Sequence, residues 1–110
     1  MRIKENEMKI IAKIILKRSY RGEHTDIHVE DLATFTIKHN KNAVIDYDYL
    51  KYQTEKIEEH LINNSLNSIE KTLYDIRLDV KQWEIGEKIY RVKDYEEKKL
   101  EMFSKFAGSL

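Results

Sequence analysis

Seven apolar residues in the second half of the chain recur at alternating steps of four and three residues. They are Ile62, Leu66, Ile69, Leu73, Ile76, Val80 and Trp83. A repeat of about 3.5 residues is the spacing of the contact positions of a helix that packs against another helix. The pattern therefore predicts a coiled-coil-like helical seam. Such a seam pairs either with a second helix of the same chain or with its own copy in a homodimer.

The segments on either side of this seam extend the helical prediction to residues 51–107. An earlier stripe is out of register with the seam, and the slip falls at residues 63–65, so we expect a helix break or a stutter there. Gly86 lies just past the seam, where helices commonly end. A looser stripe follows at Ile89, Val92, Leu100, Phe103 and Phe106. The simplest interpretation is a helical hairpin, with residues 84–93 open to an extended alternative.

The first 21 residues are predicted to form a basic helix. Lys9, Lys13 and Lys17 recur every four residues, with isoleucines largely opposite them. Ile10, Ala12, Ile14 and Leu16 also alternate, as they would in a strand, so residues 8–18 keep a strand as the alternative. We expect the helix, with Gly22 ending it.

Residues 24–50 carry the β signal. Ala33, Phe35 and Ile37 alternate with polar neighbours, and residues 44–49 alternate again after an Asn- and Lys-containing turn. Two such runs predict a β-hairpin. The expected fold is therefore α+β in a single domain of residues 1–110. In it, an N-terminal helix and a small antiparallel hairpin precede the helical region.

The charges are unevenly distributed although the net charge is zero. Residues 1–21 carry seven basic and two acidic side chains, and residues 22–66 carry nine acidic and four basic ones. Such segregation either steers a partner or is neutralised by pairing within the fold, and the second is the more frequent case. The candidate nucleic-acid contacts are Lys9, Lys13, Lys17, Arg18 and Arg21. The near-neutral isoelectric point argues against this role.

Three segments also allow a different arrangement. VEDLATFTI (29–37), YLKYQTEKIEEHLI (49–62) and IGEKIYRVKDYEEKKLEMF (85–103) can be laid on the order of helices and wing in winged-helix DNA-binding domains, which the chain weakly resembles. The resemblance implies a mainly α fold and a DNA-binding transcriptional regulator. Two features depart from it. The would-be recognition helix carries Glu55, Glu58 and Glu59, and the would-be wing overlaps the heptad seam.

The stretch GEHTDIHVED places His24, Asp26, His28 and Glu30 at alternate positions. In a regular strand these side chains would share a face, about 6.6 Å from one to the next. Four ligands in such a row cannot converge on one ion, so the pattern indicates the polar face of a strand and no metal site.

No catalytic motif, phosphate-binding loop or cysteine is present. The longest apolar-rich run, residues 10–16, contains Lys13 and is far shorter than the roughly 20 residues needed to span a membrane. The sequence therefore predicts a small, non-enzymatic cytoplasmic protein without cofactors that does not enter a membrane. We expect it to act as a regulatory or interaction protein, to bind a protein partner and to form a homodimer through the seam, with nucleic acid as the less favoured partner.

Overall fold

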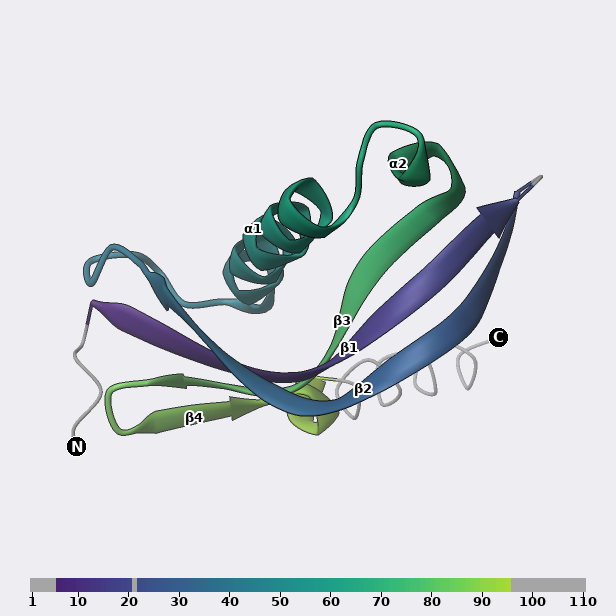
Figure 1. Cartoon of the computed structure of the whole chain (residues 1–110). Coiled ribbons are helices and arrows are strands. Elements are labelled where there is room, and N and C mark those ends of the chain that lie inside the picture. The colour runs from purple at the N-terminus through teal and green to yellow at the C-terminus, as the bar shows by residue number, and fades with distance from the viewer. Residues whose placement is uncertain (1–5, 21, 96–110) are drawn as a thin grey trace, which may run out of the picture.

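The computed structural model describes residues 6–20 and 22–95 of the chain. Its elements are, in order, β1 (Glu7–Tyr20), β2 (Glu23–Lys38), α1 (Tyr47–Ser65), α2 (Glu70–Leu73), β3 (Tyr74–Ile85) and β4 (Lys88–Arg91). The four strands form one antiparallel sheet in the order β2-β1-β3-β4. The long helix α1 lies across one face of this sheet (Figure 1).

The expected N-terminal helix is wrong, because residues 7–20 form β1 at the centre of the sheet. Met8, Ile10 and Ala12 are fully buried, so the alternation of apolar residues marks the face that packs under α1. A spacing of four residues keeps side chains on one side of a strand as well as of a helix. The lysine spacing therefore did not distinguish the two structures, whereas the alternation identified the strand.

The predicted hairpin within residues 24–50 is also corrected. Residues 23–38 do form a strand, β2, but its partner is β1, and the connection between them passes through Gly22 at φ 81°. The second half of the expected hairpin instead leads into α1. Asp46 caps this helix, because its Oδ1 accepts a hydrogen bond of 2.8 Å from the Tyr49 N–H.

The helical hairpin predicted for residues 51–107 is contradicted by the strands β3 and β4. Val80 and Trp83 are three residues apart yet both face α1, because Lys81 has no partner in β1 and forms a bulge. That extra residue produces a step of three between two buried residues of a strand, which is a spacing typical of a helix. The turn between β3 and β4 contains Gly86, at φ 59°, where we expected a helix to end.

The winged-helix alternative is excluded with the helical hairpin, because most of the described chain is antiparallel sheet and only α1 is a long helix there. The C-terminal members of the last predicted stripe, Leu100, Phe103 and Phe106, lie outside the described residues, as does Arg21. In the part of the chain that is described, no helix is both long and apolar enough to cross a membrane.

The hydrophobic core lies between α1 and the sheet. Leu50 of α1 is fully buried against residues of β1 and β3, among them Trp83, which is 2% exposed. The other face of the sheet has no counterpart to α1 among the described residues. The described part of the fold is therefore a two-layer α+β structure, with α1 over one face of the sheet and no described element over the other.

Candidate functional site

The side of the sheet that no described element covers, called the open face below, is centred on β1. Because Met8, Ile10 and Ala12 point toward α1, the alternate residues of β1 point to the open face. These residues are Lys9, Ile11, Lys13, Ile15 and Lys17. Their partners across β2 and β3 in the register of the sheet share that face.

An apolar patch occupies the open face where β1 meets β2. It consists of Ile11, Ile15, Val29 and Leu32, with Ile15 opposite Val29 and Leu32 opposite Lys13. Val29 is 49% and Leu32 is 55% exposed. An extra residue in β2 between these two positions lets both side chains point the same way although they are three residues apart. The chain thus exposes large side chains side by side, which soluble proteins usually keep scattered.

Charges of both signs run in parallel rows along the same face. The lysine row is Lys9, Lys13 and Lys17 in β1, and the acidic row is Glu84, Asp79 and Asp75, their partners in β3. Adjacent strands lie about 4.8 Å apart, so each lysine has a carboxylate beside it. On the other flank, Lys17 Nζ lies 2.9 Å from Asp26 Oδ1.

This arrangement brings together three of the five candidate nucleic-acid contacts and separates Arg18 from them, while Arg21 lies outside the described residues. Lys9, Lys13 and Lys17 share the open face, whereas Arg18, opposite Tyr74, belongs to the other side of β1. The acids of β3 place negative charge beside the lysine row, although Asp79 pairs with Lys81 and Asp75 with Arg77 of the same strand. The structure therefore favours the internal pairing of charges over a phosphate-binding surface.

The histidine and acid stretch does not form a common face. β2 has an extra residue, Ile27, so that Asp26 lies opposite Lys17 and His28 opposite Leu16, on different sides of the sheet. His28 Nε2 lies 2.8 Å from Glu30 Oε1, in an exposed contact. Among the described residues, no group of three or more potential ligands could hold a metal ion.

The members of the predicted seam have three different environments. Ile76, Val80 and Trp83 are buried under α1, Ile62 and Leu66 lie at the C-terminal end of α1, and Ile69 and Leu73 belong to the short α2 segment. Ile69 is 74% and Leu73 is 41% exposed. They do not form one continuous stripe, because β3 begins at Tyr74 and turns the last three members into the core.

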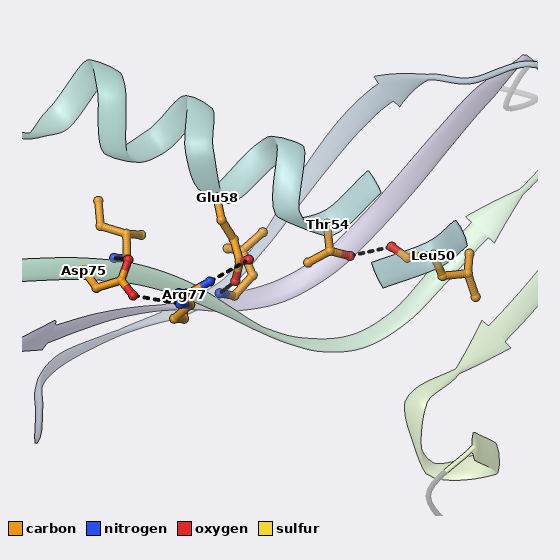
Figure 2. Close-up of polar contacts among 7 residues, drawn as sticks. Leu50, Thr54, Glu58, Asp75 and Arg77 are labelled. Carbon is orange, nitrogen blue, oxygen red and sulfur yellow. Dashed lines mark hydrogen bonds and ion pairs between the residues drawn. The ribbon is translucent and has the colours of Figure 1, made fainter. Parts of the chain in front are cut away.

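Beneath α1, polar side chains link the helix to β3. Trp83 Nε1 donates a hydrogen bond of 2.9 Å to Thr54 Oγ1, and the Thr54 hydroxyl donates one of 2.9 Å to the Leu50 carbonyl, as Figure 2 shows for the second contact. Both Thr54 and Trp83 are buried. The indole N–H is therefore satisfied inside the core, and the contact joins α1 to β3.

Glu58 makes the second link, at the outer edge of β3 (Figure 2). Its Oε2 accepts a hydrogen bond of 2.8 Å from the Leu78 N–H, and its Oε1 lies 3.5 Å from Arg77 Nη1. Arg77 Nε in turn donates to Asp75 Oδ2 at 2.8 Å. Burial raises the pKa of Glu58 above the ordinary glutamate range, although the Leu78 N–H and Arg77 act to lower it.

These carboxylates protect an edge of the sheet. β4 pairs only with residues 82–85 of β3, so residues 74–81 have no strand on that side within the described chain. Asp75 Oδ1 accepts from the Ile76 N–H at 2.9 Å, and Glu58 accepts from that of Leu78. Side chains thus occupy N–H groups that another strand would otherwise seek.

A pocket of about 200 Å³ opens between α1 and this edge. Thr54, Glu58, Val80 and Trp83 are among the residues that line it. The polar atoms of Thr54 and Glu58 already have partners in the protein. The pocket therefore presents no free reactive group of these two residues, and the open face is the stronger candidate for function.

The sequence predictions missed the main features of the open face and of the polar contacts beneath α1. The alternation of apolar residues in β1 is a usable signal for the open face, whereas the lysine spacing favours a helix instead. No sequence signal marked Glu58, because its partner Leu78 is 20 residues away and a helix glutamate is usually solvated. Comparison with known proteins adds no further guide: no family model, no curated protein and no solved structure matches the chain.

Proposed function

We propose that this protein is a small, non-enzymatic interaction protein that binds protein through the open face of its sheet. The observation that carries the proposal is the apolar patch, where Val29 and Leu32 are about half exposed beside Ile11 and Ile15. Clustered apolar side chains framed by charged ones are typical of protein-binding surfaces. A location in the cytoplasm is part of the proposal and rests on the sequence alone.

The open face suits a protein better than a nucleic acid. A phosphate backbone calls for a surface of one positive sign, whereas the acidic row accompanies the lysine row along its length. A protein partner can match both signs and cover the apolar patch at the same time. The helical seam is withdrawn as the binding surface, because three of its residues are buried in the core.

Site-specific photocrosslinking in native cells tests this proposal. A photoreactive amino acid replaces Ile15 in the patch, and in a second variant it replaces Tyr52 on the exposed side of α1. Both variants are full-length chains. We expect the Ile15 variant to form a protein adduct of defined mass and the Tyr52 variant to form none.

Two results would contradict the proposal. The first is an Ile15 variant that crosslinks to nucleic acid rather than to protein. The second is a pair of variants that crosslink equally weakly although both melt at the temperature of the unmodified protein.

A further inference from the structure

We infer that the outer edge of β2 binds an extended peptide segment of another protein, which adds to the sheet as a further strand. This inference goes beyond the proposed function, because it concerns the edge of the sheet and not its open face. β2 is the outermost strand on its side of the sheet (Figure 1), and its described pairing is with β1 alone. The backbone groups that point away from β1 therefore have no strand partner within the described chain.

The hydrogen bond at the end of β2 determines which backbone groups point outward. The His39 N–H donates to the Asn6 carbonyl at 2.9 Å, so the backbone groups of His39 face β1. Along an antiparallel strand, successive residues direct their N–H and C=O groups to opposite sides. Residues 32–38 pair with residues 7–13 without a register shift, so this alternation holds over the whole stretch. The residues whose backbone groups point outward are therefore Leu32, Thr34, Thr36 and Lys38.

The two sides of the sheet differ in how such outward groups are occupied. On β3, side-chain carboxylates accept from the Ile76 and Leu78 N–H groups. On β2, no side chain of the described chain accepts from the N–H groups of the four outward residues, and all four residues are exposed. β-bulges, which protect many edge strands, lie in residues 26–31 and not in this stretch. The fold thus protects the edge of β3 and leaves that of β2 open to pairing.

The spacing of these groups selects an extended backbone as the partner. N–H and C=O groups that recur at every second residue, about 6.6 Å apart, match the groups of another strand. Phe35 and Ile37 are half-buried and pack against the core beneath α1, so apolar side chains of an added strand beside them would extend that core. Thr34 and Thr36 lie on the open face, where β-branched residues pair well across strands.

Charges at the two ends of the stretch give the added strand a direction. Lys38 lies at one end, and Glu30 and Asp31 precede the other. Antiparallel pairing is slightly more stable than parallel pairing. An antiparallel strand with an acidic residue near its N-terminal end and a basic residue near its C-terminal end matches both charges. The partner segment is therefore extended, apolar at alternate positions and oppositely charged at its ends.

Amide hydrogen exchange, measured by NMR on the full-length protein, tests the inference. In the free protein we expect the Thr34 and Thr36 amides to exchange rapidly, and the Phe35 and Ile37 amides, which face β1, to exchange slowly. The probe is the blocked synthetic peptide Glu-Val-Thr-Val-Thr-Val-Lys, whose valines would lie beside Phe35 and Ile37. When this peptide binds, the Thr34 and Thr36 amides should become protected.

Two controls isolate the backbone contacts. The same peptide methylated on the backbone nitrogens of both threonines loses the donors that face β2, and it should bind at least about tenfold more weakly. In the protein, Thr36→Pro removes one outward N–H at an edge position that tolerates proline, and it should weaken binding of the unmodified peptide to a similar extent. Thr36→Val keeps the N–H and should bind as the wild type does. Circular dichroism verifies folding, and if Thr36→Pro unfolds, the methylated peptide on the wild type decides.

Three results would overturn the inference. The first is protection of the Thr34 and Thr36 amides in the free protein, which would show that another part of the chain or a second copy already covers the edge. The second is a methylated peptide that binds as tightly as the unmodified one. The third is the absence of new protection at about 1 mM peptide. None of these results bears on the open face, which the crosslinking from Ile15 tests separately.

Discussion

Glu58 is an ionisable side chain whose carboxyl group is largely buried in the folded protein. Its side chain is 9% exposed and lies between the Leu78 N–H and the half-exposed guanidinium of Arg77. Burial raises the pKa of Glu58 in the folded state relative to the unfolded chain. The folded state therefore holds this proton to higher pH than the unfolded state does, which makes the contribution of Glu58 to stability pH-dependent.

The sign of this dependence can be measured. Protonated Glu58 contributes its full stability below the ordinary glutamate pKa of about 4.3, and that contribution is lost as pH rises through the raised folded-state pKa. Urea unfolding of the wild type and Glu58→Gln from about pH 4 to pH 7 should show the wild type losing stability relative to the variant. Glu55→Gln, an exposed neighbour on α1, should track the wild type, and a parallel pair of curves for Glu58→Gln would contradict the expectation.

A second residue-scale prediction concerns the only tryptophan. Thr54→Val removes the acceptor of the Trp83 indole N–H while nearly preserving shape, and leaves a buried donor unsatisfied. We expect a loss of about 1–3 kcal/mol in the free energy of unfolding. Thr72→Val, at an exposed hydroxyl bonded to the Ile69 carbonyl, serves as control and should lose less. Thr54→Ser should retain most of the stability, and equal effects of Val and Ser would refute the hydrogen-bond explanation.

At the scale of elements, the start of α1 at Tyr47 is stabilised by its N-cap residue, Asp46. Asp46 accepts from the Tyr49 N–H in an exposed position, and Asp46→Ala should cost about 1 kcal/mol of stability. Asp46→Asn keeps an acceptor and should cost less, while Asp48→Ala, in the first turn without this bond, is the comparison. Chemical denaturation measures all three, and an Asp48 variant as destabilised as the Asp46 variant would point to helix charge rather than to capping.

The strands also show how much of the secondary structure could be predicted from the sequence. The alternation around Phe35 correctly located part of β2, and the alternation around Ile10 was sufficient to identify β1 had the lysine spacing not been preferred. The seam failed for a specific reason. A step of four fits both a helix and a strand, and the single step of three within β3 falls on the bulge at Lys81. A bulge depends on the register with a strand some 70 residues away, which local periodicity cannot report.

For the candidate site, the residues were partly visible and their arrangement was not. Lys9, Lys13 and Lys17 do share a face, but it is a face of a strand and not of the expected helix, and the acids beside them come from β3, which was also expected to be helix. The exposed pair of Val29 and Leu32 depends on one extra residue between them in β2, which has no local signature. Pairing across the sheet, rather than composition, decides what the open face can bind.

At the scale of the whole molecule, peptide binding at the edge of β2 has a thermodynamic signature that needs no variant. A peptide that binds the folded protein and not the unfolded chain raises the melting temperature as its concentration rises. We expect the probe peptide, at about ten times its dissociation constant, to raise the melting temperature by several degrees, measured by circular dichroism. The peptide methylated on its threonines should have little effect at the same concentration. An equal rise with both peptides would contradict pairing through the backbone.

The central position of β1 has a consequence for synthesis on the ribosome. Its partner β2 follows directly, so that hairpin can form as soon as both strands have left the exit tunnel. The partner on the other side, β3, arrives only after α1, and Met8 must wait for Ile85. During that interval the apolar side of β1 lacks β3 beside it, so the core beneath α1 is incomplete. Until β3 is available, the nascent chain exposes apolar surface that the finished fold buries, and such surface is prone to aggregation.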